Sequence, residues 1–200
     1  MTGIPADVAG RIRLVILDSD GVMTDGGIYT SVDAEGRSFG MRRFHVQDGI
    51  AVFLLRRAGV RVAIVSGKLS PALDARGREL GIDDVFTVDA RDKLATVAGL
   101  LVRDGIEWSE VACLGDDLAD LPLLERVGLP GAVANAVPEV RAAAAWHGQR
   151  AGGDGAVREF AEALLRVDGR WTDLLEAYLS ECRDRAAVVE EELGGPESPR

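Results

Sequence analysis

The chain has 200 residues, a length typical of one domain, and such a domain buries about 70% of the surface of its unfolded chain without a disulfide or metal clip. Its 33 acidic and 23 basic residues give a net charge of −10, which argues against nucleic acid or an anionic membrane surface as the main partner. No stretch approaches the ~20 apolar residues that span a bilayer, and residues 1–10 lack a signal-peptide pattern, so we expect a soluble cytoplasmic protein. Cys113 and Cys182 lack metal-ligand spacing, and we expect both to be reduced.

Short apolar runs alternate with segments of helical spacing over most of the chain. The runs cover 14–17, 60–65, 85–88, 111–114 and, more weakly, 131–134. Alternating strands and helices predict a parallel sheet that is covered by helices on both faces. We therefore predict an α/β fold with a doubly wound, Rossmann-like sheet. Ligands bind such sheets at the carboxyl ends of the strands, where the strand order reverses.

One segment interrupts this alternation between the first strand and the first helix. Residues 27–31 and 37–46 have the pattern of two extended arms around the turn 32–36, which predicts a β-hairpin over about 26–47. A hairpin at this place could form a flap over the site, although a surface hairpin without a role is the alternative. Because an isolated two-stranded hairpin is marginally stable, we expect it to pack on something.

The last third of the chain is mainly helical. After Pro138 the sequence predicts a short helix, a weak extended piece around Trp146, the glycine loop 151–155 and a helix from Ala156 to about Arg166. Residues 171–193 predict a final amphipathic helix. The polar residues 194–200 are expected to be a disordered tail.

Two carboxylates follow the first predicted strand directly. Asp18 and Asp20 stand two residues apart, and Gly21 allows the backbone to turn there. In such a pair one carboxylate can attack a substrate while the other carries a proton. An Asp-rich turn without chemistry is an equally good interpretation of this motif alone.

Three further motifs fall where other predicted strands end or helices begin. Ser66 and Gly67 offer a hydroxyl and backbone amides that suit a phosphoryl oxygen. Lys93 begins a predicted helix, an unusual place for a cation, although a lone lysine there is more often a surface residue. A third loop holds three carboxylates, those of Asp116, Asp117 and Asp120. Carboxylates concentrated in one loop favour a hard cation such as Mg²⁺, and Asp116 is the preferred ligand.

In this order and placement, the motifs resemble the four motifs of the haloacid dehalogenase superfamily of phosphatases. The resemblance covers about residues 11–166 and is closest to the small phosphatases of 3-deoxy-2-keto sugar acids, such as the 3-deoxy-D-manno-octulosonate 8-phosphate phosphatases and the phosphatase-like domain of acylneuraminate cytidylyltransferases. The resembling segments are D-S-D-G-V-M-T-D-G-G-I-Y, F-H-V-Q-D-G, G-D-D-L-A-D and A-G-G-D-G-A-V-R-E-F.

The resemblance implies a role for each motif residue. Asp18 would be the nucleophile that forms an aspartyl phosphate, and Asp20 would act as general acid and base. Mg²⁺ would be held by Asp18, the backbone carbonyl of Asp20 and Asp116. Ser66 and Lys93 would bind the transferring phosphoryl group, and Asp117 and Asp120 would position the metal waters and Lys93.

The spacing of the motifs leaves no room for a cap domain. The resemblance then implies a homotetramer in which a neighbouring subunit covers each active site, and an exposed hairpin with apolar side chains is consistent with it. We divide the chain into a leader segment 1–10, a phosphatase domain 11–168, a C-terminal helix 169–193 and the tail 194–200.

The chain departs from its relatives where a sugar-acid carboxylate is expected to bind. Gln47 and Asp154 each stand where the octulosonate enzymes usually carry an arginine, and Arg42 and Arg43 of the hairpin could supply replacement cations. His45 at the base of the flap could also touch the substrate. The candidate substrate-binding residues are therefore Ser66, Gly67, Lys93, Arg42, Arg43, Gln47, Asp154 and Arg158.

The resulting hypothesis is a Mg²⁺-dependent phosphatase for a phosphorylated keto-deoxy sugar acid of eight or nine carbons. A phosphatase for another small sugar or nucleoside phosphate is the main alternative, because two expected cations are missing. A non-catalytic oligomerisation module is a second alternative, which the presence of all five motif residues disfavours. A receiver domain of two-component signalling is rejected because the order of its motifs along the chain differs. A receiver has an early acidic pair and a phosphoacceptor Asp at the end of a middle strand, whereas here the D-x-D motif comes early and the acidic cluster comes late.

Overall fold

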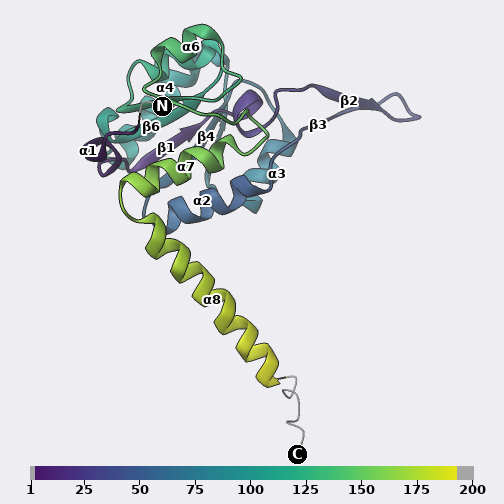
Figure 1. The fold of residues 1–200 in the computed structure, drawn as a ribbon. Coiled ribbons are helices and arrows are strands. Elements are labelled where there is room, and N and C mark those ends of the chain that lie inside the picture. The colour runs from purple at the N-terminus through teal and green to yellow at the C-terminus, as the bar shows by residue number, and fades with distance from the viewer. Residues whose placement is uncertain (1–2, 193–200) are drawn as a thin grey trace, which may run out of the picture.

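A six-stranded parallel sheet forms the centre of the protein in the computed structural model, which describes residues 3–192 (Figure 1). The strand order is β5-β4-β1-β6-β7-β8. Residues 14–17 pair with 61–64 on one side and with 111–114 on the other. The predicted doubly wound sheet is therefore confirmed. The strands are β1 (Leu14–Leu17), β4 (Arg61–Ser66), β5 (Asp84–Thr87), β6 (Val111–Gly115), β7 (Leu129–Ala132) and β8 (Trp146–His147).

Helices cover both faces of the sheet because its central strands are apolar on both sides. Every residue of β1 and β6 is buried, as expected for a parallel sheet between two helical layers. Helices α2 (Gln47–Arg57) and α7 (Ala156–Val167) pack side by side on one face (Figure 1). The other helices of the body are α3 (Pro71–Glu79), α4 (Lys93–Asp104), α5 (Leu121–Leu124) and α6 (Pro138–Ala143), with short helical turns at Ala90–Asp92, Trp108–Glu110 and Leu118–Asp120.

The strand order reverses at β1, and this places the site. From β1 the chain moves outward through β4 and β5, then returns to the other side of β1 for β6, β7 and β8. The connections that follow β1 and β6 therefore run toward opposite edges of the sheet. This leaves a crevice at the carboxyl ends of β1, β4 and β6.

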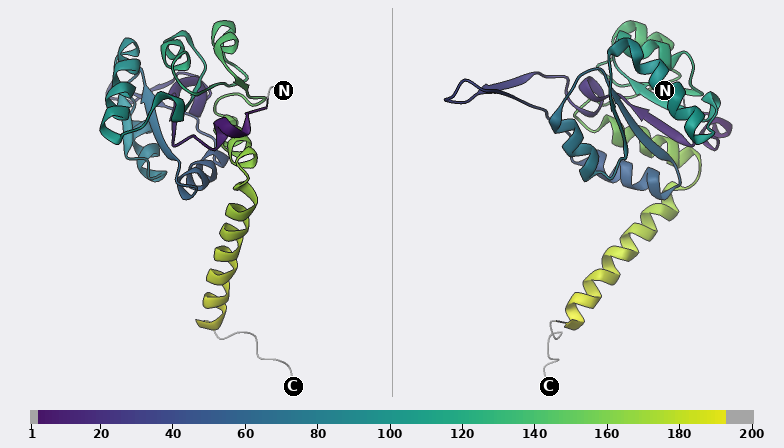
Figure 2. Two further views of the ribbon diagram at one scale, coloured as in Figure 1. Left: turned by 90° about the vertical axis from the view of Figure 1, so that its left-hand side faces the viewer. Right: turned by 180° about the vertical axis from the view of Figure 1, so that it is seen from behind.

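The predicted hairpin is present and projects far from the body (Figures 1 and 2). Its strands are β2 (Tyr29–Val32) and β3 (Ser38–Met41), joined in antiparallel register. The prediction that its second arm reaches residue 46 was wrong. Regular pairing ends at Met41, one further antiparallel bridge joins Phe44 to Thr24, and Val46 already has a helical conformation. No cap domain interrupts the described part of the chain.

The two ends of the described chain differ in how they pack. Helix α1 (Ala6–Ala9) contributes Ala9 to the core, and Ile4, two residues before this helix, is also buried there. Helix α8 (Trp171–Glu192) starts on the body and then extends away from it (Figure 2). The expected tail 194–200 lies outside the described residues. None of the helices in 3–192 is long and apolar enough to cross a membrane.

Both cysteines are free thiols, as the sequence predicts. Cys113 is buried in β6, whereas Cys182 is exposed on α8. Tyr178 packs against Phe53 of α2, and Glu181 pairs with Arg57, so the first half of α8 is attached to the body.

Candidate active site

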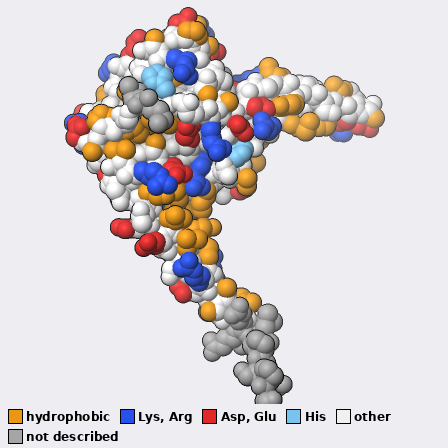
Figure 3. Space-filling model, viewed as in Figure 1, with side chains coloured by type: hydrophobic (Ala, Val, Ile, Leu, Met, Phe, Trp, Pro, Cys, Tyr) orange, Lys and Arg blue, Asp and Glu red, His pale blue; other side chains and the backbone are white. Residues whose placement is uncertain are grey.

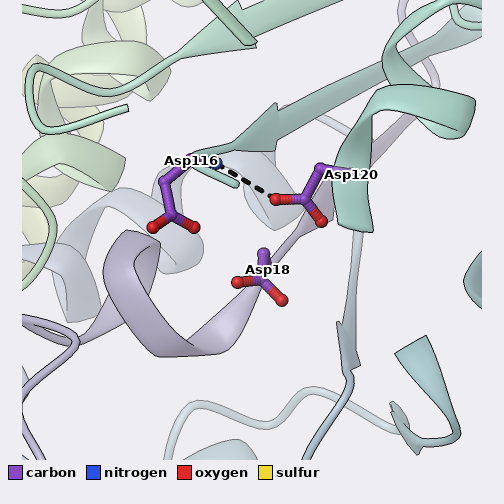
Figure 4. Close-up of side chains that lie close together, drawn as sticks. All are labelled: Asp18, Asp116 and Asp120. Carbon is purple, nitrogen blue, oxygen red and sulfur yellow. Dashed lines mark hydrogen bonds between the residues drawn. The ribbon is translucent and has the colours of Figure 1, made fainter. Parts of the chain in front are cut away.

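Four predicted motifs meet at the carboxyl edge of the sheet. Asp18 directly follows β1, Ser66 is the last residue of β4, and Asp116 directly follows β6. Lys93 is the first residue of α4, which follows β5 in the chain, and its ammonium reaches Asp18. The side chains of Asp18, Asp116 and Asp120 lie close together there (Figure 4).

The turn Ser19–Met23 brings the backbone unusually close to Asp116. Gly21 has φ +101°, a backbone conformation that residues with a side chain rarely adopt. A Cβ atom at Gly21 would lie 2.0 Å from Oδ2 of Asp116, so the Asp116 carboxylate could not keep its present position. The glycine is therefore required both for the turn and for the space that the Asp116 carboxylate occupies.

Lys93 is buried between two carboxylates. Its ammonium lies 2.6 Å from Oδ1 of Asp18 and 2.8 Å from Oδ1 of Asp120. Burial by itself lowers the pKa of Lys93, but the attraction of both carboxylates outweighs burial and raises this pKa above its usual value. The lysine is therefore a permanent cation inside the site, and the alternative of a surface lysine is wrong.

Asp116 and Asp120 have different surroundings. Oδ2 of Asp120 accepts a hydrogen bond from the backbone N–H of Asp116 at 3.1 Å, and its Oδ1 contacts Lys93, so both oxygens are satisfied. Oδ1 of Asp116 is buried and has no hydrogen-bond partner within the described residues. Burial, followed by repulsion from Asp18, Asp120 and Asp117, raises the pKa of Asp116 to about 8.

These residues fit a divalent metal ion. The carboxylate oxygens of Asp18, Asp116 and Asp120 lie within 4.8 Å of one another. Three carboxylates and one ammonium leave two negative charges uncompensated when all are ionised. Carboxylate oxygens without other partners are suitable ligands for a hard cation such as Mg²⁺. Asp18 and Asp116 have oxygens to offer, whereas Asp120 already uses both of its own.

Asp20 stands apart from this cluster and is held by the hairpin. Nε of Arg42 donates to its carboxylate at 2.7 Å, and the Arg42 side chain is only 8% exposed. Arg43 lies 3.6 Å from Asp25 on the same turn-containing loop. Both arginines that the sequence offers as free replacement cations are thus paired with carboxylates of this loop.

Ser66 and Gly67 occupy the end of β4 as expected. The buried hydroxyl of Ser66 donates to the carbonyl of Lys68 at 3.1 Å and accepts from its N–H at 3.2 Å. Gly67 lies against Ala90, which a Cβ atom would approach to 3.3 Å. The two residues form a tight turn at the carboxyl end of β4.

The late glycine loop packs directly on the turn after β1. A Cβ atom at Gly152 would lie 1.9 Å from the carbonyl oxygen of Gly21, so only glycine fits. Asn135 joins the two segments: its Nδ2 donates to the carbonyl of Gly21 at 2.9 Å, and its Oδ1 accepts from the N–H of Gly152 at 2.7 Å. Sequence reasoning missed Asn135, because nothing local distinguishes it from any loop asparagine.

Asp48 is a second missed residue, although it lies in the F-H-V-Q-D-G segment. It is buried at the start of α2, and its Oδ1 accepts from the N–H of Arg158 at 2.9 Å, in the first turn of α7. The residue before that helix, Gly155, has no side chain to cap it. Asp48 therefore caps α7 from a neighbouring helix. Burial raises the pKa of Asp48 to about 6, and the Arg158 N–H and the nearby charge of His45 oppose this.

Replacing Asp48 tests this cap. Asp48→Ala removes the acceptor and should cost about 1 kcal/mol or more of unfolding free energy. Asp48→Asn keeps an acceptor and removes a buried charge. Because the pKa of Asp48 is raised in the folded protein, protonation of Asp48 stabilises the fold fully below about pH 4, and this stabilisation is lost as pH rises through about 6. Asparagine does not titrate, so the unfolding free energy of Asp48→Asn, measured in urea, should rise relative to that of wild type as pH rises. A difference in unfolding free energy that does not change with pH would contradict this account.

The remaining predicted substrate residues lie at the starts of α2 and α7 and in the late glycine loop, and Gln47 and Arg158 line one cavity. Gln47 begins α2, and the Asp154 side chain is exposed in the late loop. The Arg158 guanidinium lies 5.0 Å from the ring centre of Trp171 and pairs with Glu162. Arg150, which the sequence did not single out, lies between Gln47 and Asp154: its Nη1 is 3.5 Å from Oε1 of Gln47 and 3.3 Å from the carbonyl oxygen of Asp154.

Comparison with known proteins agrees with this geometry. A model of the haloacid dehalogenase-like hydrolases matches residues 86–160. The 3-deoxy-D-manno-octulosonate 8-phosphate phosphatase of Escherichia coli K12 is 38% identical over 170 residues, which is 84% of this chain and 88% of that protein. The Moraxella catarrhalis phosphatase of the same name, solved with magnesium, phosphate and KDO, superposes with TM-score 0.80 at 34% identity, covering 86% of this chain and 97% of that one.

A third relative was solved with a different metal. The deoxy-D-mannose-octulosonate 8-phosphate phosphatase of Haemophilus influenzae, in a cobalt-bound form, superposes with TM-score 0.74 at 34% identity. The match covers 81% of this chain and 92% of that one.

Proposed function

This chain belongs to the haloacid dehalogenase-like hydrolases and is a phosphatase, and we propose that its substrate is a phosphorylated 3-deoxy-2-keto sugar acid of eight or nine carbons. The observation that carries the substrate proposal is the likeness, over most of both chains, to a relative solved with magnesium, phosphate and KDO. 3-Deoxy-D-manno-octulosonate 8-phosphate is the first candidate. A phosphatase for another small sugar or nucleoside phosphate is the alternative, because neither Gln47 nor Asp154 carries a positive charge.

In the proposed reaction, an oxygen of Asp18 attacks phosphorus and the sugar alcohol leaves. Asp20 gives a proton to the leaving oxygen, and water then hydrolyses the aspartyl phosphate with Asp20 as base. The position of Asp18 directly after β1, beside a buried cation, supports its role. Asp20 is held by Arg42 from the hairpin, which supports a flap that orients the proton donor.

Lys93 and Ser66 would bind the phosphoryl group. The Lys93 ammonium is already in place beside Asp18, so it can stabilise negative charge without rearrangement. The Ser66 hydroxyl and the N–H of Gly67 can donate to other phosphoryl oxygens. Asp120 would hold Lys93 in position, and Asp117 would orient metal-bound water.

Asp18 and Asp116, with the backbone carbonyl of Asp20, would hold Mg²⁺. The unpartnered oxygen of Asp116 and the raised pKa of this group support that role. When bound, the ion would offset the repulsion between the phosphate and the carboxylates. Inactive oligomerisation is disfavoured, since Lys93 would then be buried with no function.

We propose that the protein forms a homotetramer in which the hairpin covers a neighbouring site. Four large apolar side chains on the projecting hairpin are more than half exposed: Ile28 by 72%, Val32 by 62%, Phe39 by 51% and Met41 by 53%. Exposed apolar patches of this kind favour protein contacts. Light scattering of the full chain would measure the subunit number.

A phosphate-release screen tests the substrate. With Mg²⁺ present, kcat/KM for keto-deoxy sugar-acid phosphates should exceed that for hexose or nucleoside phosphates by about tenfold or more, the difference expected from one charged contact. Chelation of the metal by EDTA should remove activity on every ester, and added Mg²⁺ should restore it. An equal or greater kcat/KM on non-acidic esters would refute the sugar-acid assignment without refuting the phosphatase.

A further inference from the structure

The substrate proposed above carries a negative charge at each end. The phosphoryl group has Lys93, but the carboxylate at the other end of the sugar needs its own cation, because the chain as a whole carries a net charge of −10. The late loop and the base of the hairpin both contact the turn after β1, so a cation on either segment is close to the site.

Most arginines near the hairpin base are already neutralised. Arg42 is paired with Asp20, Arg43 with Asp25, and Arg76 with Glu79 at 2.8 Å. On α7, Arg158 and Arg166 both pair with Glu162. A substrate carboxylate would have to displace a protein carboxylate from each of them.

Arg150 differs from these arginines. Within residues 3–189 it forms no ion pair, and only Nη1 of its guanidinium makes hydrogen bonds, both to neutral oxygens. Its side chain is exposed, and it lines a cavity of about 450 Å³ together with Gln47 and residues of α7. Basic side chains gather on this face between the base of the hairpin and the start of α8 (Figure 3).

A second nitrogen lies beside the Arg150 guanidinium. A Cβ atom at Gly155 would be 3.0 Å from Nη1 of Arg150 and 3.3 Å from Nδ1 of His45, so both nitrogens lie close to the Gly155 backbone, where a side chain would crowd them. Nδ1 of His45 is buried and has no hydrogen-bond partner among the described residues. Buried polar atoms normally have a partner, and this one faces the segment that carries Arg150.

The position of Arg150 connects this cation with the catalytic turn. It lies two residues before Gly152, whose backbone contacts Gly21. It also contacts Gln47 and Asp154, the two positions at which the octulosonate enzymes usually carry an arginine and this chain does not. Resting on the proposed function, we propose that Arg150, with His45 beside it, binds the carboxylate of the sugar acid. A guanidinium can bind a carboxylate through two parallel hydrogen bonds.

The test compares two substrates on two variants. The variants are Arg150→Gln and, as a matched control, Arg166→Gln, which removes a paired arginine from the same cavity. The substrates are 3-deoxy-D-manno-octulosonate 8-phosphate and p-nitrophenyl phosphate, which has no carboxylate. Arg150→Gln should lower kcat/KM for the sugar acid by about tenfold or more, mainly through KM, and change that for p-nitrophenyl phosphate by less than about twofold. Arg166→Gln should leave both unchanged, and Arg150→Lys should recover part of the loss.

The outcomes separate this proposal from the proposed function. If wild type prefers the sugar acid and Arg150→Gln keeps that preference, the role of Arg150 is overturned while the function stands. If both substrates lose activity equally in Arg150→Gln, the residue only supports the loop and the proposal is also overturned. If wild type has no preference for the sugar acid, the proposed function fails and the role of Arg150 fails with it.

Discussion

Replacing Asp18 with Asn is expected to lower kcat by at least about 10⁴-fold, the scale of loss seen when a nucleophile is removed. The amide has nearly the same size but cannot form the acyl phosphate. Lys93 keeps its contact with Asp120, so the buried ammonium still has a partner and the chain should fold. Phosphate release under saturating Mg²⁺ and circular dichroism measure the two effects.

Asp83→Asn is the matched control, because Asp83 is an exposed residue before β5, away from the carboxyl edge. It should retain wild-type kcat. An Asp18→Asn variant that kept more than about one hundredth of the activity would rule out Asp18 as the nucleophile, since general electrostatic effects alone could then explain the loss.

Replacing Asp116 with Asn is expected to remove Mg²⁺-dependent activity by at least about 10³-fold, or roughly 4 kcal/mol of transition-state stabilisation. The same variant should be more stable than wild type without metal. The reason is that Asp116 is buried among Asp18, Asp117 and Asp120, so its charged form is disfavoured in the folded protein. Asn has no charge to desolvate.

The pH dependence of this stability difference follows from the raised pKa. The folded value of about 8 lies above the ordinary value of 3.8, so proton binding at Asp116 stabilises the fold fully below about pH 4 and this stabilisation is lost as pH rises through about 8. Without metal, the advantage of Asp116→Asn in melting temperature should therefore grow between about pH 6 and pH 9.

Added Mg²⁺ should reverse the order of the two proteins. Wild type gains about 2.7 kcal/mol when the free ion is at about 100 times its dissociation constant, whereas the variant should gain little. The gain should be larger at high pH, because the ligands must be deprotonated to bind the ion. Equal Mg²⁺-induced shifts in both proteins would show that Asp116 is not a ligand.

Much of the fold was predictable because its strands are buried on both faces. A run such as Leu14–Leu17 is apolar throughout and is followed by turn residues, so its type and its end are both visible in the sequence. The ends of parallel strands gather at one edge, which is why Asp18, Ser66 and Asp116 could be placed together. The domain boundaries and the roles of the site residues stay predictions.

The features that the sequence could not predict depend on contacts between distant segments. Nothing near Arg42 indicates that it pairs with Asp20, which lies 22 positions earlier. Asp48 caps a helix that begins more than 100 residues later, and Asn135 bridges two loops. The regular pairing of the second arm of the hairpin ends at Met41, and Val46 already has a helical conformation before α2.

The central claim is that Asp18 becomes covalently phosphorylated during turnover, and chemical trapping tests it most directly. The wild-type protein would be mixed with Mg²⁺ and the ester it hydrolyses fastest, quenched in acid within one turnover and treated with borohydride, which reduces an acyl phosphate to an alcohol. Peptide mass mapping should then find homoserine at residue 18 and unmodified aspartate at residue 20. Homoserine at Asp20 or Asp116, or no homoserine at all in a protein that releases phosphate, would contradict the account.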